Sequence, residues 1–348
     1  MKKIMHIFAN SEQYPNKFVP DYARFLKDGI GKVENSFFVF GDRHNLATDV
    51  DFKLVSKSIF GLISLACQSR SFDKVIFHSI PSRFFLIFLF FNFLSFSKVK
   101  NYLVLWGGEV HFIKQPTLKD KINHKLNNLF MRFMDGFITY LKADFELAVQ
   151  LSGNKTACWV NIQSVYPSNV ARTEFLIDKS APLRILIGAS ALKGNRHFET
   201  IDLLANAVSD SDIEYVIPLS YGDREYAEQV SAYANSKLRG KVKPLTDFMG
   251  LDEYTKLLST IHIAFFMHTG QQGMGNIRNL LALGANVYMN QESISYMYFS
   301  ELNFKVFNIH SLEKIAFESD MDANIELARE LFSREKLLQD TERFFLND

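Results

Sequence analysis

Short apolar runs alternate with amphipathic runs along most of the chain. In the first half the apolar runs have the length of buried strands, and they lie at Lys3–Phe8, Ser36–Phe40, Lys74–His78, Asn101–Trp106 and Gly136–Thr139. Helix-like stretches separate them. This order of strands and helices predicts a doubly wound parallel sheet.

The alternation weakens after Trp159 and then resumes. Tyr166–Pro182 contains two prolines and several polar residues with little periodicity, which is typical of a linker. A second series of apolar runs follows at Leu183–Ile187, Tyr215–Leu219, Val242–Pro244, Ile261–Met267, Ala285–Met289 and Lys305–Phe307. The sequence therefore predicts an α/β protein with two Rossmann-like doubly wound domains that face a cleft.

The chain of 348 residues is long enough for two such domains, each with its own core. We expect the first domain at 1–165, a linker at 166–182 and the second domain at 183–325. The amphipathic run Ile325–Phe345 predicts that residues 326–348 form a closing helix that packs back across the domains.

Composition excludes several classes of protein. A formal net charge of +1 argues against a dedicated nucleic-acid binder. Cys67 and Cys158 have neither a metal-ligand spacing nor a disulfide framework, which suits a reducing cytoplasm. The apolar run at the amino terminus is too short for a secretory signal.

Phenylalanine is abundant, and Ser82–Phe96 concentrates it. That run is shorter than the roughly 20 apolar residues that cross a bilayer. Two interpretations stay open for Phe84–Phe96, a buried helix or a helix that also contacts a membrane surface. Lys98 and Lys100 behind the run and Arg83 at its start would suit anionic headgroups in the second case.

The most informative stretch is Ile261–Asn290, which reads as a strand, a polar glycine-punctuated loop, a helix and a second strand. Ligands of open α/β sheets bind at the carboxyl ends of strands, where glycine lets backbone N–H groups approach a diphosphate. The loop offers candidate binding residues for a nucleotide, namely Gln271, Gln272, Gly273, Gly275 and Asn276, with His268 ahead of them. The alternative is an ordinary turn between a strand and a helix.

Two more loops are expected at the same edge of the second sheet. Leu183–Ile187 leads into a polar cluster with the candidate ligand-binding residues Gly188, Ser190, Asn195 and His197. This cluster is not a phosphate-binding P-loop, because Lys193 precedes the last glycine. Helix capping is the alternative for Asn195 and His197. Tyr221 follows the next strand and Tyr254 lies ahead of the loop at 268–276, so both tyrosines are candidates for contact with a base or a sugar.

Two titratable side chains follow strands of the first domain. His78 ends one strand, and Glu109 follows the next one after Trp106. Either group would take a proton from an attacking hydroxyl if its pKa lies near neutrality. The alternatives are a satisfied core histidine for His78, and a structural cap or a substrate hydrogen bond for Glu109. His111 and Asp21 are weaker candidates of the same type.

Metal binding is not expected. Asp-X-Asp triplets occur at 49–51, 210–212 and 320–322, but none follows a strand end where phosphates would lie. The sequence therefore predicts no metal and no cofactor.

The segments WGGEVHF, IGASALKGNRH, VIPLSYGDREYAEQV and FFMHTGQQGMGN resemble, in this order and spacing, one family of bacterial transferases. That family adds 4-acetamido-4,6-dideoxygalactose (Fuc4NAc) to the lipid-linked precursor of enterobacterial common antigen. The resemblance implies a two-domain GT-B glycosyltransferase that uses a dTDP-activated sugar, inverts the anomeric centre and acts at the inner membrane face. Glu109 stands where the family pattern has aspartate, and Gly270 where it has arginine.

Together these observations predict a metal-independent inverting glycosyltransferase of cell-surface polysaccharide synthesis. The second domain would bind the nucleotide sugar, and the first a lipid-linked saccharide. We expect a peripheral protein at the cytoplasmic face of the inner membrane, with Glu109 or His78 as the base. The alternatives are an isomerase similar to nucleotide-sugar 2-epimerases and a non-catalytic glycan- or nucleotide-binding protein.

Overall fold

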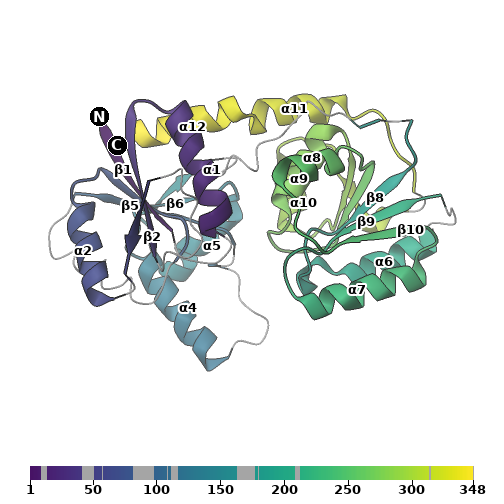
Figure 1. The fold of residues 1–348 in the computed structure, drawn as a ribbon, viewed down its shortest axis with the longest axis horizontal. Helices are drawn as coiled ribbons and strands as arrows, with labels where there is room; N and C mark the ends of the chain where they lie inside the picture. Colours follow the sequence, from purple (N-terminus) through teal and green to yellow (C-terminus); the bar gives the residue numbers. More distant parts are fainter. Residues whose placement is uncertain are drawn as a thin grey trace. The chain divides into compact units, whose positions relative to one another are not determined.

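The computed structural model describes residues 1–8, 14–40, 51–56, 58–80, 98–107, 109–110, 117–162, 177–178, 180–207, 212–312 and 315–347. The chain divides into two compact units (Figure 1). Unit 1 comprises Met1–Ser168 and Glu335–Asp348, and unit 2 comprises Asn169–Arg334. The segment Phe84–Phe96 and His111 lie outside the described residues.

Unit 1 is built on a parallel sheet of seven strands with the order β3-β2-β1-β4-β5-β6-β7. The strands are β1 (Lys2–Phe8), β2 (Val33–Phe40), β3 (Phe52–Val55), β4 (Lys74–Phe77), β5 (Lys100–Val104), β6 (Gly136–Ile138) and β7 (Cys158–Val160). Its helices include α1 (Tyr14–Gly29), α2 (Ile59–Ser69), α4 (Leu118–Met131), α5 (Lys142–Ser152) and α12 (Arg334–Leu346). Because β1 pairs with both β2 and β4, the strand order reverses beside β1.

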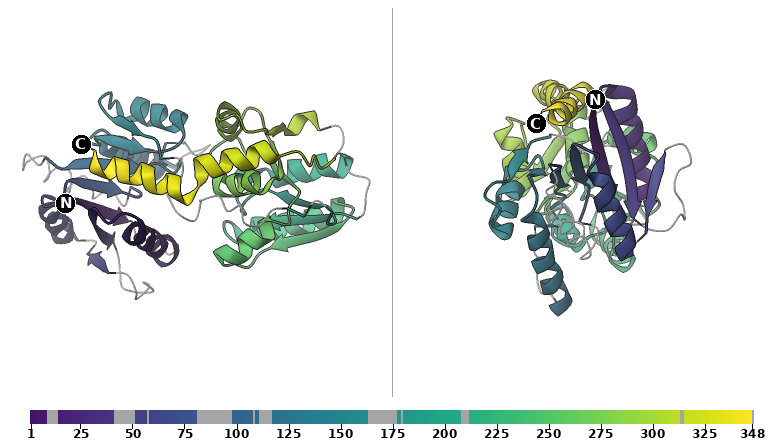
Figure 2. Two further views of the ribbon diagram at one scale, coloured as in Figure 1. Left: turned by 90° about the horizontal axis from the view of Figure 1, so that it is seen from above. Right: turned by 90° about the vertical axis from the view of Figure 1, so that its left-hand side faces the viewer.

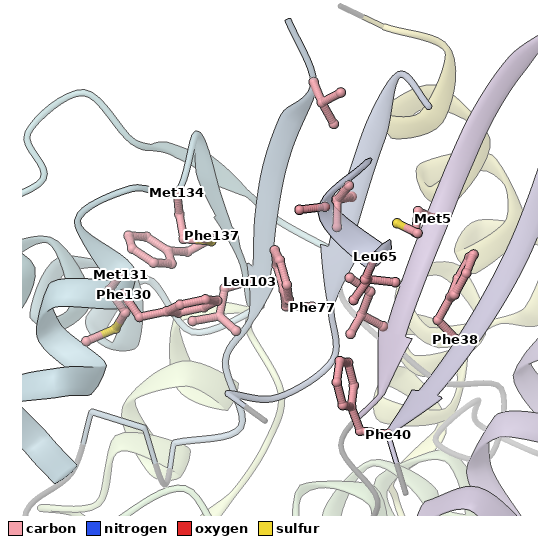
Figure 3. Close-up of a cluster of buried hydrophobic side chains, with 14 of the residues drawn as sticks. Met5, Phe38, Phe40, Leu65, Phe77, Leu103, Phe130, Met131, Met134 and Phe137 are labelled. Carbon is pink, nitrogen blue, oxygen red and sulfur yellow. The ribbon is translucent and has the colours of Figure 1, made fainter. Parts of the chain in front are cut away.

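Aromatic side chains fill the core of unit 1, as Figure 3 shows. Phe77 of β4 meets Phe130 of α4 edge to face, with ring centroids 5.2 Å apart. Phe38 and Phe137, from strands on either side, are also fully buried. Buried aromatic pairs of this kind add roughly 0.5–1.5 kcal/mol beyond the burial of their area, so much of the phenylalanine in this chain serves the core.

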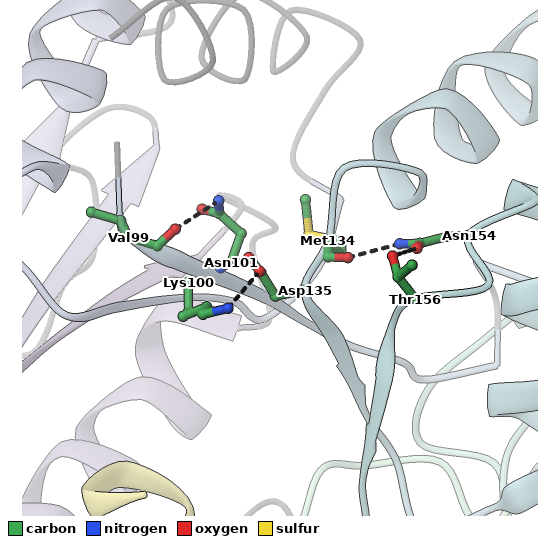
Figure 4. A network of polar contacts seen from close by, with 7 residues as sticks. All are labelled: Val99, Lys100, Asn101, Met134, Asp135, Asn154 and Thr156. Carbon is green, nitrogen blue, oxygen red and sulfur yellow. Dashed lines mark hydrogen bonds and ion pairs between the residues drawn. The ribbon is translucent and has the colours of Figure 1, made fainter. Parts of the chain in front are cut away.

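Polar contacts fix the amino-terminal edge of the same sheet (Figure 4). The Asp135 carboxylate accepts hydrogen bonds from the Asn101 backbone N–H at 2.8 Å and from Lys100 Nζ at 3.3 Å. Buried Asn154 donates from Nδ2 to the Met134 carbonyl at 2.7 Å. These side chains satisfy backbone groups between α4, β5 and β6 that would otherwise be unpaired.

Unit 2 is built on a second parallel sheet, of six strands with the order β10-β9-β8-β11-β12-β13. The strands are β8 (Arg184–Ile187), β9 (Glu214–Pro218), β10 (Lys241–Leu245), β11 (Ile263–Phe266), β12 (Asn286–Met289) and β13 (Phe307–Asn308). The helices include α6 (His197–Ala207), α7 (Arg224–Lys237), α8 (Leu251–Leu258), α9 (Met274–Leu283), α10 (Ile294–Glu301) and α11 (Asp322–Phe332). Both sheets have the strand order of doubly wound folds. The predicted α/β class with two Rossmann-like parallel sheets is confirmed.

The structure differs from the sequence expectation at short strands and near the carboxyl terminus. Strands β3 and β7 were not expected, because each is very short, β3 contains a lysine, and β7 is not fully buried. The run expected as one closing helix is two helices, α11 and α12 (Figure 2). Ser333 between them has extended backbone, φ −69° and ψ 161°, and serine there is a favoured start for the next helix.

Candidate functional site

Three loops meet at the carboxyl edge of the sheet in unit 2. Strand β8 lies between β9 and β11, and all three run in the same direction. The loop after β8 is loop A (188–196), the loop after β9 is loop B (219–223), and the loop after β11 is loop C (267–273). The strand order reverses between β8 and β11, which is where open α/β sheets bind ligands.

Asn195 organises loop A from within. Its Nδ2 donates to the Ser190 carbonyl and to Ser190 Oγ, each at 3.1 Å, and its Oδ1 accepts from the Ala189 N–H at 3.1 Å. Both residues are buried. The hydrogen bonds between Ser190 and Asn195, which are both predicted binding residues, therefore hold loop A in its conformation.

His197 begins α6 and points its ring at the end of β8. A Cβ atom on Gly188 would lie 2.5 Å from His197 Nε2, so a larger residue would clash with the ring. Gly188 also has φ +71°, a backbone conformation that favours glycine. Nδ1 lies 3.3 Å from the Tyr226 hydroxyl, whereas Nε2 has no hydrogen-bond partner among the described residues. Burial lowers the His197 pKa to about 4, so the ring is neutral at pH 7.

Loops A and B are joined through their backbones. The Ala191 N–H donates to the Tyr221 carbonyl and the Asp223 N–H donates to the Ala191 carbonyl, each at 2.9 Å. Gly222, with φ +119°, allows this approach, because a Cβ atom there would lie 2.5 Å from the Ala191 carbonyl oxygen. The side chain of Tyr221 is 54% exposed. This predicted residue thus offers an aromatic face beside loop A.

Loops A and C are also in contact. A Cβ atom on Gly194 would lie 2.5 Å from Gln272 Nε2, and one on Gly273 would lie 2.9 Å from the Ala189 Cβ. Gly273 has φ +62° and precedes α9. Gln272 Oε1 is buried without a hydrogen-bond partner in the described part of the chain. No side chain caps α9, so its first N–H groups and its positive dipole end remain available to an anion.

The other predicted residues of the second domain border loop C. Tyr254 of α8 hydrogen-bonds the side chain of Asn276 in the first turn of α9. Burial raises the Tyr254 pKa, with a smaller contribution of the same sign from Tyr221. Gln271 is half-buried, and the Gly275 carbonyl accepts from Asn279 Nδ2 at 3.0 Å. The nucleotide-sugar candidates other than Tyr254 therefore lie on these loops or on the first turns of the helices that follow them, and Tyr254 contacts one of those turns from α8.

His268, in loop C, is a buried acceptor that was not among the predicted binding residues. Its Nδ1 lies 2.8 Å from the Gly270 carbonyl, which only accepts, so Nδ1 carries the proton and Nε2 keeps its lone pair. Nε2 is buried with no hydrogen-bond partner in the described ranges. Burial lowers the His268 pKa to about 4. Its position one residue beyond the apolar run was the signal that could have marked it.

The positively charged side chains within loops A, B and C all belong to loop A. Lys193 is exposed and forms no ion pair with any described residue, whereas Arg196 pairs with Glu199 at 3.0 Å. Arg278 of α9 is fully buried, with its guanidinium 4.9 Å from the centre of the Phe332 ring. Lys193 is therefore the cation of loop A that remains available to a ligand.

In unit 1 the predicted base His78 belongs to a buried chain of polar groups. Because Asn35 Oδ1 only accepts, His6 donates to it from Nε2 at 3.0 Å. His6 Nδ1 then accepts from His78 Nε2 at 3.1 Å. The His78 ring also stacks on Phe8 with centroids 4.1 Å apart. Burial, and then the neighbouring His6, lower the pKa of His78 well below its usual value.

Glu109 is half-buried and connected to His78 through Trp106. The Glu109 carboxylate accepts from the Trp106 backbone N–H at 2.9 Å, and the Trp106 indole donates to the His78 carbonyl at 2.7 Å. The two predicted bases therefore lie on adjacent loops after β4 and β5. The link through Trp106 could not be predicted from the sequence, because it depends on the pairing of those strands.

Among the described residues, no group of three or more His, Cys, Asp and Glu side chains could hold a metal ion. The prediction of metal independence stays a prediction. In the same part of the chain, no helix combines the length and apolar character needed to cross a membrane.

Solved structures similar to this chain over nearly its whole length include glycosyltransferases of the GT-B class. The lipopolysaccharide outer core galactosyltransferase WaaB is similar with TM-score 0.65 and 10% identity, over 98% of each chain. Sucrose-phosphate synthase of Thermosynechococcus elongatus gives 0.70 and 8%, over 99% of this chain and 98% of that one. Anabaena HepE in complex with UDP-glucose gives 0.61 and 12%, over 99% of each. The chain thus has the GT-B fold.

A comparison with protein families gives a more specific assignment than the fold does. The model of a family described as 4-alpha-L-fucosyltransferase, glycosyl transferase group 56, matches residues 35–319. The chain belongs to this family, and it is a glycosyltransferase.

Proposed function

We propose that this enzyme transfers Fuc4NAc, or a closely related deoxyamino sugar, from a dTDP-activated donor to a lipid-linked saccharide, with inversion and without a metal ion. The observation that carries the proposal is the meeting of loops A, B and C where the strand order reverses in unit 2. Membership of glycosyl transferase group 56 supports sugar transfer. The reaction would belong to cell-surface polysaccharide synthesis at the cytoplasmic face of the inner membrane.

The diphosphate would bind beside α9 and loop A. Departure of the nucleotide leaves negative charge on the diphosphate, and fixed dipoles and cations lower the barrier by meeting that charge. The uncapped N-terminus of α9 and the ammonium of Lys193 are suited to this role. Gly188 and Gly273 keep the backbone open there, since each has positive φ. Tyr221 would stack on the base or contact the ribose.

The donor sugar would be recognised by groups that accept hydrogen bonds. Phosphate oxygens at neutral pH are acceptors, so they do not satisfy the lone pair on His268 Nε2. A sugar hydroxyl or an acetamido N–H does. We assign this contact to His268, because a buried acceptor without a donor costs about 1–3 kcal/mol until a ligand supplies one.

Glu109 is the proposed base for the acceptor hydroxyl. Its carboxylate is half-buried and held by the Trp106 N–H, whereas His78 Nε2 is engaged with His6 and the ring is buried. In the reaction the acceptor oxygen would form the new bond to the anomeric carbon, its proton would pass to Glu109, and the bond to the dTDP oxygen would break. The His6–His78 pair would then support the loop that holds Glu109.

A transfer assay with dTDP-Fuc4NAc and lipid-linked saccharide tests this assignment. Glu109→Gln keeps the shape of the side chain and removes its basicity, so kcat should fall by about 10²–10⁴-fold while dTDP affinity is unchanged. His78→Asn serves as the comparison and should lose stability more than turnover. Full turnover in Glu109→Gln would reject Glu109 as the base, and no transfer by the wild type would reject the donor.

A further inference from the structure

Helix α4 of unit 1 carries apolar side chains on its solvent side. Leu118 is 75% exposed, Ile122 48% and Leu129 42%, and Phe133 in the turn after the helix is 46% exposed. The spacing of four, seven and four residues places them on one side, within a sector of about 60°. We call these four residues the α4 stripe.

The opposite side of α4 already has its core. Phe130 and Met131 are buried. Met131 lies on the side of the helix opposite the α4 stripe, and Phe130 lies about 90° around the helix from the middle of the stripe. Thr117 and Asp120 form a capping box that fixes the start of the helix. The α4 stripe is therefore not the side of the helix that packs into the core of unit 1. A helix of a soluble domain normally presents polar residues to solvent, so this apolar side needs another explanation.

Positive charge flanks the α4 stripe. Lys121, Lys125 and Arg132 are exposed along one border, and Lys119 is exposed along the other. Asp120 is the one acidic residue between 118 and 132, and its carboxylate is engaged with Thr117. The solvent side of α4 is thus apolar along its middle and basic at its borders.

We propose that the α4 stripe is a docking surface for an anionic lipid bilayer. Apolar side chains between lysines and arginines match an interfacial helix, whose cations meet the headgroups while the apolar residues enter the acyl boundary. Figures 1 and 2 show α4 extending outward from the sheet of unit 1. A protruding ridge meets a flat bilayer without needing a shaped partner.

Other occupants fit these observations less well. A stable protein interface buries about 800 Å² on each partner, and four side chains of one helix offer much less. A second copy would bring the cations of one stripe against those of the other. The proposal rests on the peripheral membrane location proposed above and names the surface that produces it.

Vesicle co-sedimentation of the full chain tests the surface. The protein should bind vesicles containing phosphatidylglycerol more than vesicles of pure phosphatidylcholine, and less as salt rises. Leu118→Ser with Ile122→Ser should weaken binding by at least about tenfold. Lys121→Glu with Lys125→Glu should weaken it by at least about 30-fold, because each cation near the surface contributes roughly a factor of five to ten.

Controls separate the outcomes. Lys237→Glu with Arg239→Glu makes the same charge change at exposed positions of unit 2 and should leave binding unchanged. Melting temperature should not fall in the stripe variants, since these side chains are exposed. Equal binding of the wild type and the stripe variants would overturn the proposal. A lower melting temperature in the stripe variants would overturn it too, because it would mean that the α4 stripe packs against protein. So would a dimer that forms in the wild type and is lost in the variants, because the stripe would then contact a second copy. Vesicle binding needs no donor, so its failure is distinguishable from failure to bind dTDP.

Discussion

Two buried histidines of unit 2 keep a ring nitrogen without a partner in the described ranges. His197 faces Gly188 at the end of β8, and His268 stands in loop C after β11. Their pKa values of about 4 keep both rings neutral, so in the proposed site they would act as hydrogen-bond partners of a ligand rather than as charges. At this scale the proposed donor site is a set of neutral polar atoms beside one available lysine.

The depressed pKa values predict how stability depends on pH. Unfolded histidine takes up its proton near pH 6.5, whereas His197 and His268 do so near pH 4 in the folded chain. Between these values the unfolded chain holds more protons. The free energy of unfolding therefore falls as pH falls below 6.5, by roughly 3 kcal/mol per histidine, and levels off near pH 4.

Thermal melting between pH 7 and pH 4 checks this dependence. The variant His310→Gln, at an exposed position, should follow the wild-type curve. A melting temperature that stays constant from pH 7 to pH 5 would contradict neutral burial of the two rings.

His268 allows a sharper prediction. In His268→Asn the amide can still donate to the Gly270 carbonyl, but the Nε2 acceptor is lost. In His268→Gln an amide oxygen lies near the Nε2 position. We expect His268→Asn to weaken binding of dTDP-Fuc4NAc by about tenfold and to leave dTDP affinity unchanged, with partial recovery in His268→Gln. Equal loss for dTDP and for the nucleotide sugar, measured by calorimetry, would mean that His268 only supports loop C.

At the scale of elements, the loops that follow parallel strands create the site. Gly222 joins loops A and B because its φ of +119° and its missing Cβ let the two backbones meet. Gly222→Ala should lower the free energy of unfolding by about 1–3 kcal/mol and weaken dTDP binding. Gly250→Ala is the matched control, since open space surrounds that residue and its φ is −62°. Similar effects of the two substitutions in denaturant titrations would count against the special role of Gly222.

The sequence predicted those elements that are buried, because a buried element appears in the sequence as an apolar run. Strands such as β4 and β11 are buried on both faces and were expected from their patterns. The break at Ser333 was missed, because the apolar periodicity continues through it. Loop residues such as Gln272 were identified from glycine spacing. The contact of Trp106 with His78 was missed, because it depends on the pairing of β4 and β5 and not on local sequence. His268 was missed as a candidate, because the local sequence does not show that its Nε2 is buried without a partner among the described residues.

At the scale of the whole molecule, one chain builds two parallel sheets of the same strand order. In unit 2 the reversal of strand order lies beside loops A and C, and in unit 1 it lies beside His78. The carboxyl-terminal residues from Glu335 belong to unit 1, where Lys74 Nζ donates to the carbonyls of Phe344 and Asn347 near the end of α12. A lysine at that end also complements the helix dipole.

The most direct test of the account is a thermal-shift titration with dTDP, UDP and GDP, each with and without EDTA. A ligand that binds only the folded chain stabilises it by about 2.7 kcal/mol at a hundred times its dissociation constant. We predict a shift with dTDP that exceeds those with UDP and GDP and that EDTA leaves unchanged. The absence of a shift with every nucleotide would contradict the site on loops A, B and C, and a shift that EDTA removes would contradict metal-independent binding.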